Sequence, residues 1–116
     1  MIIVLTDKAL TKKDVQKARE EYAGYIKITA DLKKGLVALG GEYHADAEEI
    51  LVKKYGCRSV DIWGGGYSVN LAKFEVNAIL NIKPGINDSP DILDPRIREA
   101  FLRLVGDRLE KIKMFL

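Results

Sequence analysis

The segment from Asp94 to the C-terminus carries the longest helical pattern in the sequence. Asp94 suits the cap of a helix and Pro95 its first position, where the missing N–H of proline costs nothing. Apolar residues then recur every three or four positions, which is the period of an amphipathic helix. A helix with one apolar face must bury that face, so the rest of the chain has to provide a second layer. The apolar stripe consists of Ile97, Phe101, Leu104, Val105, Ile112 and Leu116.

Short alternating segments predict that the second layer is a β-sheet. Between Tyr25 and Leu32 apolar and polar residues alternate, as in a strand with one buried face. The turn at residues 33–35 then indicates a hairpin, and the three glycines at 64–66 indicate a loop between two later strands. The five expected strands are residues 1–7, 25–32, 36–41, 58–63 and 73–83.

Two further helices are expected between these strands. Thr11 and Asp14 have the spacing of a capping box, and a second box of the same kind starts at Asp46. The second helix should end at Gly56, since glycine readily takes the left-handed conformation that ends helices. The element order is therefore β-α-β-β-α-β-β-α. Because short turns join the strand pairs, we predict one α+β domain over residues 1–116, with a mostly antiparallel sheet and its three helices on one side.

Composition narrows the class of protein. An apolar fraction of 47% and a charged fraction of 31% are typical of a folded, soluble domain. No apolar run approaches the length of about 20 residues that crosses a bilayer, and the first residues lack the basic flank of a signal peptide. The single cysteine, Cys57, cannot form an internal disulfide, so we expect a reducing compartment, with the cytoplasm as the default. Charged side chains greatly outnumber amide side chains, and Gln16 is the only glutamine, a composition that favours a thermophilic source.

The charge of the chain argues against a polyanionic partner. The net charge is only +2, and the basic residues of the C-terminal segment are interleaved with acidic ones. A nucleic-acid-binding surface would gather its basic residues on one face. We therefore expect no nucleic-acid partner and no membrane partner. An unknown small ligand or protein partner stays open, as does the oligomeric state.

The first of three segments that could carry chemistry is residues 40–46, Gly-Gly-Glu-Tyr-His-Ala-Asp, which joins a strand to a helix. If the chain is still extended there, Glu42 and His44 point to the same side and could act as metal ligands or as an acid–base pair. The dipole of the following helix would keep His44 neutral. A structural explanation is also available: Asp46 is a helix cap, the glycines form a turn, and a lone histidine is more often a hydrogen-bonded structural residue.

The second segment is residues 61–66, Asp-Ile-Trp-Gly-Gly-Gly. Asp61 and Trp63 share one strand face and could form a binding wall, or Trp63 could simply cover the second face of the sheet. The glycines are not a phosphate-binding loop, because no Gly-Lys-Ser/Thr follows them. Cys57, just before this segment, follows the end of a helix, whose dipole raises the pKa of the thiol and makes it a poor nucleophile.

The third segment, residues 81–87, places Asn81 and Lys83 on one face beside a stiff loop. Together the three segments resemble the motifs of a family of small prokaryotic proteins of unknown function, in the same order and over almost the whole chain. The triple glycine departs from the family pattern. The resemblance implies a shared fold, carries no reaction across, and favours one ligand-binding site made of Glu42, His44, Asp61, Trp63, Asn81 and Lys83. The matching motifs are residues 40–51, 61–64, 81–84 and 94–99.

Three functions stay open at this point. The leading hypothesis is a binding or regulatory module, whose polar cluster at one end of the sheet holds a small ligand or a partner segment. The first alternative is a hydrolase that depends on a divalent metal, with Glu42, His44 and Asp61 as ligands around an open coordination position. In the second alternative the motifs only fix turns and caps, and the protein acts through a protein–protein surface. The sequence points to no cofactor other than this divalent metal.

Overall fold

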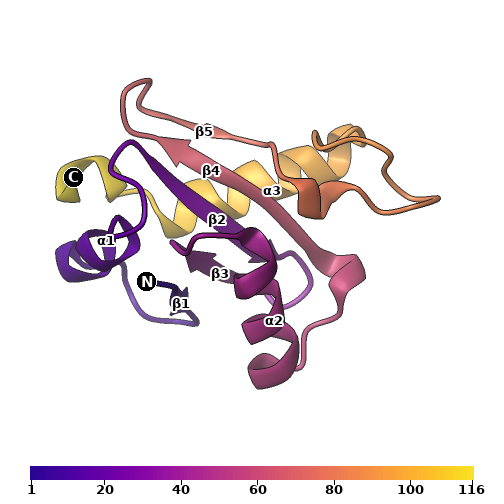
Figure 1. Ribbon diagram of the computed structural model, residues 1–116, viewed down its shortest axis with the longest axis horizontal. Helices are drawn as coiled ribbons and strands as arrows, with labels where there is room; N and C mark the ends of the chain where they lie inside the picture. Colours follow the sequence, from indigo (N-terminus) through magenta and orange to yellow (C-terminus); the bar gives the residue numbers. More distant parts are fainter.

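The computed structural model describes residues 1–116 and shows a five-stranded antiparallel sheet with α-helices packed on it (Figure 1). The strands lie in the order β1-β3-β2-β4-β5, and every neighbouring pair is antiparallel. The predicted α+β class and element order are confirmed. The strands are β1 (Ile3–Leu5), β2 (Tyr25–Asp31), β3 (Leu36–Leu39), β4 (Ile62–Ser68) and β5 (Lys73–Glu75). The helices are α1 (Lys12–Ala18), α2 (His44–Tyr55) and α3 (Pro95–Arg108), with short 3-10 turns η1 (Ser59–Asp61), η2 (Ile79–Asn81) and η3 (Ile112–Phe115).

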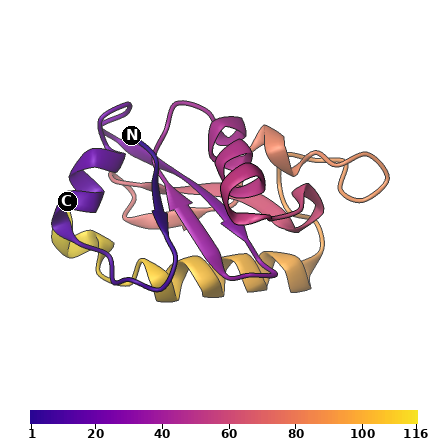
Figure 2. The ribbon, with the colours of Figure 1, turned by 90° about the horizontal axis from the view of Figure 1, so that it is seen from below.

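The helices lie on both faces of the sheet, so the prediction that they share one side is wrong. Figure 2 shows α3 along one face of the sheet and α2 across the other. Side chains alternate along β2, and Ile26 and Ile28 join the core on the α3 face. Thr29 and Asp31 point the opposite way and are also buried. Their polarity had indicated a solvent-facing side, whereas α2 covers them.

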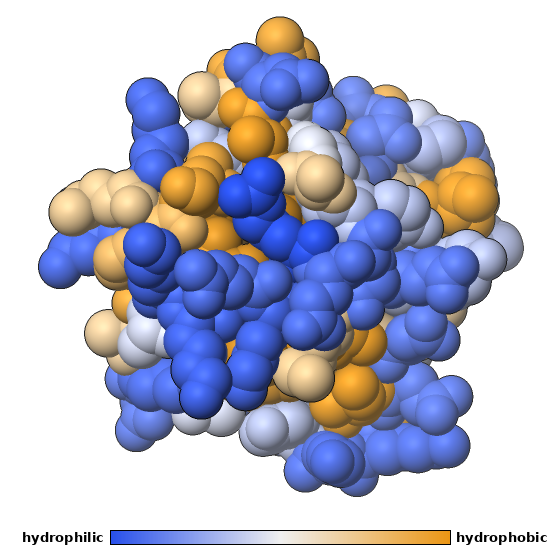
Figure 3. Space-filling view, turned by 60° about the vertical axis from the view of Figure 1, so that its left-hand side comes forward, coloured by the Kyte–Doolittle hydropathy of each residue, from blue (hydrophilic) through white to orange (hydrophobic).

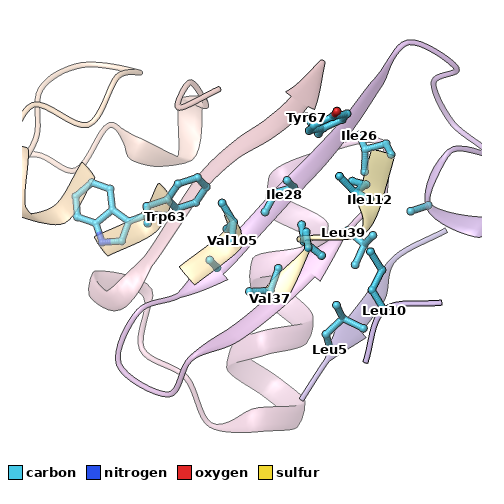
Figure 4. Close-up of a cluster of buried hydrophobic side chains, with 14 of the residues drawn as sticks. Leu5, Leu10, Ile26, Ile28, Val37, Leu39, Trp63, Tyr67, Val105 and Ile112 are labelled. Carbon is cyan, nitrogen blue, oxygen red and sulfur yellow. The ribbon is translucent and has the colours of Figure 1, made fainter. Parts of the chain in front are cut away.

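The main core fills the space between the sheet and α3 (Figure 4). The predicted apolar stripe is confirmed for Phe101 and Val105, which are fully buried. The helix ends earlier than predicted, at Arg108, and Ile112 reaches the core from η3. Leu116, predicted to belong to the stripe, is exposed. The core therefore depends on α3 and on the turn that follows it.

The helix ends follow local hydrogen bonds. The capping box of α1 is confirmed, since Thr11 Oγ1 accepts from the N–H of Asp14 and the Asp14 carboxylate accepts from the N–H of Thr11, both at 3.1 Å. The second predicted box is wrong. Helix α2 begins at His44 after an N-cap at Tyr43 that makes no side-chain bond, and the N–H of Asp46 already donates to the carbonyl of Tyr43. The predicted end at Gly56 is confirmed, with φ of 69°.

Two strands differ from the prediction. The glycines at 64–66 lie inside β4, because residues 62–68 pair with the whole of β2. The reversal comes later, at residues 69–72, where Ala72 has a φ of 52°. Strand β5 covers only residues 73–75, and the alternating segment after it folds into η2 instead of continuing as a strand.

None of the helices combines the length and the apolar composition that a span across a bilayer requires. The side of the molecule turned forward in Figure 3 is mostly hydrophilic, with hydrophobic surface showing between the hydrophilic side chains.

Candidate functional site

Three consecutive glycines form the middle of β4 and set the geometry of the site. Gly64, Gly65 and Gly66 are buried, and a Cβ atom on any of them would meet a neighbouring atom at less than 3.0 Å. At Gly66 that Cβ would lie 2.1 Å from the ring of Tyr25, and at Gly64 it would lie 3.0 Å from Cδ2 of His44. The missing side chains therefore let two aromatic rings lie directly on the strand. These rings form a floor on the α2 face of the sheet.

His44 is the first residue of α2, and its ring is fixed against β4. Nε2 lies 2.7 Å from the carbonyl oxygen of Gly65. A carbonyl oxygen can only accept, so Nε2 carries the proton and donates it, while Nδ1 of the neutral ring keeps its lone pair. The Cδ2–Nε2 edge thus faces Gly64 and Gly65, and Nδ1 lies on the opposite edge of the ring. His44 therefore presents a hydrogen-bond acceptor that points away from the sheet.

The surroundings of His44 favour this neutral form. Burial lowers the pKa of His44, the hydrogen bond to Gly65 opposes that shift, and the positive charge of Lys27 lowers the pKa further. The sequence predicted a neutral ring from the dipole of the following helix. The direction is confirmed, and the main cause is burial against β4.

We predict that the imidazole of His44 titrates at a lower pH in the folded protein than in the unfolded chain. Because folding disfavours the charged ring, the stabilising contribution of neutral His44 is complete above the unfolded pKa of about 6.5 and is lost as the pH falls through the lowered folded pKa. His44 is the only histidine, so NMR of the imidazole protons reports its pKa directly.

The matched control for this titration is His44→Gln, which keeps an N–H donor for Gly65 but has no titrating group. Over the same acid range, the free energy of unfolding of this variant should fall less than that of the wild type. The carboxylates titrate in both proteins, but His44 titrates only in the wild type. A folded-state pKa at or above the unfolded value would contradict the prediction.

A pocket of about 1030 Å³ opens beside His44 on the α2 face. The first turn of α2 forms one wall, β5 with the segment after it forms the other, and Arg98 of α3 also lines the pocket. The volume is near the upper end of the range for small-molecule sites, about 300–1000 Å³. Its ionisable lining side chains are Tyr25, Lys27, Tyr43, His44, Glu48, Lys73, Glu75, Asp91 and Arg98.

Positive and negative side chains balance around this pocket. Lys27 Nζ lies 5.9 Å from the ring centroid of Tyr25, within the range of a cation–π contact. Burial and the nearby charge of Glu75 raise the pKa of Tyr25 to about 12, so its hydroxyl keeps its proton and can donate. Arg98 and Asp91 form an ion pair with each other. The pocket thus offers donors and acceptors without a large net charge.

Asn81, one of the predicted site residues, is used inside the fold. Its Oδ1 accepts from the N–H of Gly64 at 2.8 Å, and its Nδ2 donates to the carbonyls of Gly64 and Pro90 at 2.9 Å. The side chain thereby takes the place of a neighbouring strand where β5 has ended. Asn87 supports the same segment, with Nδ2 within 2.9 Å of three backbone carbonyl groups. The two asparagines shape the wall of the pocket without lining it.

Asp61, Trp63 and Lys83 form a separate group at the start of β4, and none of them lines the pocket. Trp63 is only 3% exposed and belongs to the main core. Lys83 Nζ lies 4.9 Å from the Trp63 ring centroid and donates to the carbonyl of Ser59 at 2.8 Å. Burial lowers the pKa of Lys83, and the charges of Glu48 and Asp61 oppose that shift. This group ties the segment after η2 to the start of β4.

The predicted metal ligands do not come together. Glu42 is exposed, and its carbonyl accepts from the hydroxyl of Tyr22 at 3.4 Å. Because α2 already begins at His44, the expectation that Glu42 and His44 leave one extended segment on the same side is wrong. No group of three or more His, Cys, Asp or Glu side chains has an arrangement that could hold a metal ion. Glu42, His44 and Asp61 therefore do not form one metal site.

Cys57 is buried in a small cluster with Leu51 of α2. Burial and the neighbouring carboxylate of Asp31 raise the pKa of its thiol to about 12. The predicted upward shift of the thiol pKa is confirmed, and its main cause is burial instead of the helix dipole.

Comparison with known families matches residues 3–108 to a family described as "Protein of unknown function (DUF5674)". The chain belongs to the DUF5674 family. This confirms the resemblance to a family of unknown function. No curated protein and no solved structure matches the chain.

The sequence did not predict most of the residues that line the pocket of this DUF5674 protein. Of the six predicted site residues only His44 lines it, and Asn81 bonds to the backbone of Gly64 at the edge of β4. Tyr25, Lys27 and Glu75 were not predicted. The alternation of side chains along the strands could have identified them. All three point away from the main core, toward the face where β4 has no side chains at Gly64 and Gly66.

Proposed function

We propose that this DUF5674 protein is a binding module that holds a small ligand in the pocket between α2 and β5. The observation that supports the proposal is a neutral histidine at the floor of a pocket of about 1030 Å³, with the acceptor edge of its ring turned away from the sheet. Small-molecule sites combine a mostly apolar cavity with a few well-placed polar groups. Half of the sixteen residues that line this pocket are hydrophobic, and the polar groups lie among them.

The lining indicates the class of ligand. Cations and anions are equally represented, since the lining holds Lys27, Lys73 and Arg98 beside Glu48, Glu75 and Asp91, and Arg98 pairs with Asp91. A strongly charged ligand would therefore meet repulsion as well as attraction. Nδ1 of His44 needs a donor, and the Tyr25 hydroxyl needs an acceptor. We propose a neutral or zwitterionic, partly apolar molecule that carries an N–H or O–H group.

Metal-dependent hydrolysis receives no support from this geometry. Of its three proposed ligands, Glu42 and Asp61 lie outside the pocket that contains His44. A binding site built around His44 needs neither of them.

The proposal is tested by a screen of small neutral and zwitterionic compounds, including free amino acids and heterocyclic amides, followed through amide and imidazole chemical shifts. A binding compound should shift the His44 ring and the amides of residues 43–45, 48 and 73–80, which line the pocket. No binding compound, or shifts confined to another surface, would contradict the proposal.

Two tryptophan variants on α2 separate pocket binding from surface binding. Ala45→Trp fills the pocket from an exposed position and should abolish the shifts. Lys54→Trp adds the same ring to an exposed position on the same helix outside the pocket and should leave them unchanged. Equal responses from the two variants would contradict the assignment of the site.

A further inference from the structure

Strand β5 is an open edge of the sheet. It pairs with β4 on one side, and residues 73–75 have no backbone partner on the other. Such an edge can accept a strand from another chain, and proteins usually protect it with charges or by keeping it short. Lys73 and Glu75 are charges of this kind, opposite Ser68 and Gly66, while Phe74 points to the other face.

The side chains of β5 are complementary to a second copy of themselves. We propose that β5 pairs with β5 of a second DUF5674 chain, antiparallel and in a register centred on Phe74. The two-fold axis makes each contact reciprocal. Lys73 then lies opposite Glu75 of the partner subunit, and the inverse pair forms beside it. Opposed residues of an antiparallel pair share a face, so both ion pairs lie on the α2 face.

The opposite face of the pairing is aromatic. Phe74 lies opposite Phe74 of the partner subunit, on the face where its ring packs edge-on against Tyr67 with a centroid distance of 5.0 Å. Phe74 is only half-buried in the single chain, so it has surface left to cover. Leu71 and Ile79 flank β5 and are 62% and 82% exposed, which provides apolar surface at both ends of the pairing.

Charge selects this register and this edge. A pairing centred on Lys73 would oppose two lysines, and one centred on Glu75 would oppose two glutamates, which is destabilising. The other edge strand, β1, consists of Ile3, Val4 and Leu5 and has no charge that could choose a register. Of these three registers, only the one centred on Phe74 places the lysine of each β5 strand opposite the glutamate of the other.

The dimer brings the two ligand pockets together. Lys73 and Glu75 belong to the pocket wall, and both subunits present their α2 face on the same side of the continuous sheet. The two pockets therefore adjoin across the two-fold axis. The pairing itself does not depend on a ligand.

Sedimentation equilibrium of the wild-type protein tests the inference, with an expected mass of twice 13.0 kDa. Lys73→Glu and Glu75→Lys each oppose like charges and should each give a monomer. The double variant restores opposite charges in the same register and should return to a dimer. Lys13→Glu, an equal charge change on the exposed side of α1, should stay dimeric.

A monomeric wild type overturns the inference, and so do single variants that remain dimeric, because the dimer would then use another surface. A double variant that stays monomeric also overturns it. Circular dichroism shows that each variant is folded. The proposed function is tested independently of the dimer, since ligand binding is measured by chemical shifts and the pairing by mass.

Discussion

Phe101→Ala is expected to lower the free energy of unfolding by about 3–5 kcal/mol, the usual cost of deleting a fully buried phenylalanine ring. Phe101 has no exposed surface and lies at the centre of the contact between α3 and the sheet. Two of its ring atoms come within 2.9 Å of the place where a side chain on Gly65 would begin. The ring thus fills the space that β4 leaves open, and alanine cannot fill it.

Urea denaturation followed by circular dichroism measures the loss, with the m-value as a check that unfolding stays two-state. Met114→Ala is the control, because Met114 is 73% exposed and substitutions at such positions usually change stability by less than about 0.5 kcal/mol. Equal effects of the two substitutions would mean that α3 does not dock through Phe101.

Local patterns predicted those parts of the fold whose cause is local. The cap at Thr11, the end at Gly56 and the hairpin from β2 to β3 depend on residues a few positions apart, and all three are confirmed. The stripe of α3 is visible because one face of that helix packs on the sheet. The alternation of β2 was also recognisable, although it could not show that Thr29 and Asp31 would be covered by α2.

The errors have long-range causes. A run of glycines has low strand propensity, so Gly64–Gly66 indicated a loop. Seven residue pairs with β2 keep these glycines in β4 instead. In the same way, the alternation after β5 indicated a strand, but the side chain of Asn81 bonds to Gly64 and ends the ladder there. Neither contact is visible in a local window of sequence.

The candidate site was predictable only in part for the same reason. His44 stands out as the single histidine beside a glycine pair. Its role depends on Gly65, which is 21 positions away in the chain. Tyr25 and Glu75 come to the pocket from two further strands. The glycines of β4 thus link the fold and the site, because Gly65 admits Phe101 on one face while Gly64 and Gly66 admit His44 and Tyr25 on the other.

Gly65→Ala is therefore expected to destabilise the protein by about 3 kcal/mol, at the upper end of the range for an overpacked core. A Cβ atom at this position would lie 2.2 Å from the carbonyl oxygen of Glu75, which is backbone and cannot rotate away, and 2.9 Å from the Phe101 ring. Either β5 or α3 has to move. The matched control is Gly106→Ala in α3, where a Cβ meets nothing within 4 Å, and alanine there should stabilise the protein by about 0.5–1 kcal/mol. The same chemical change thus has opposite signs at the two positions, as measured by urea denaturation. If Gly65→Ala is neutral or stabilising, the close packing of β4 against β5 and Phe101 described above is wrong.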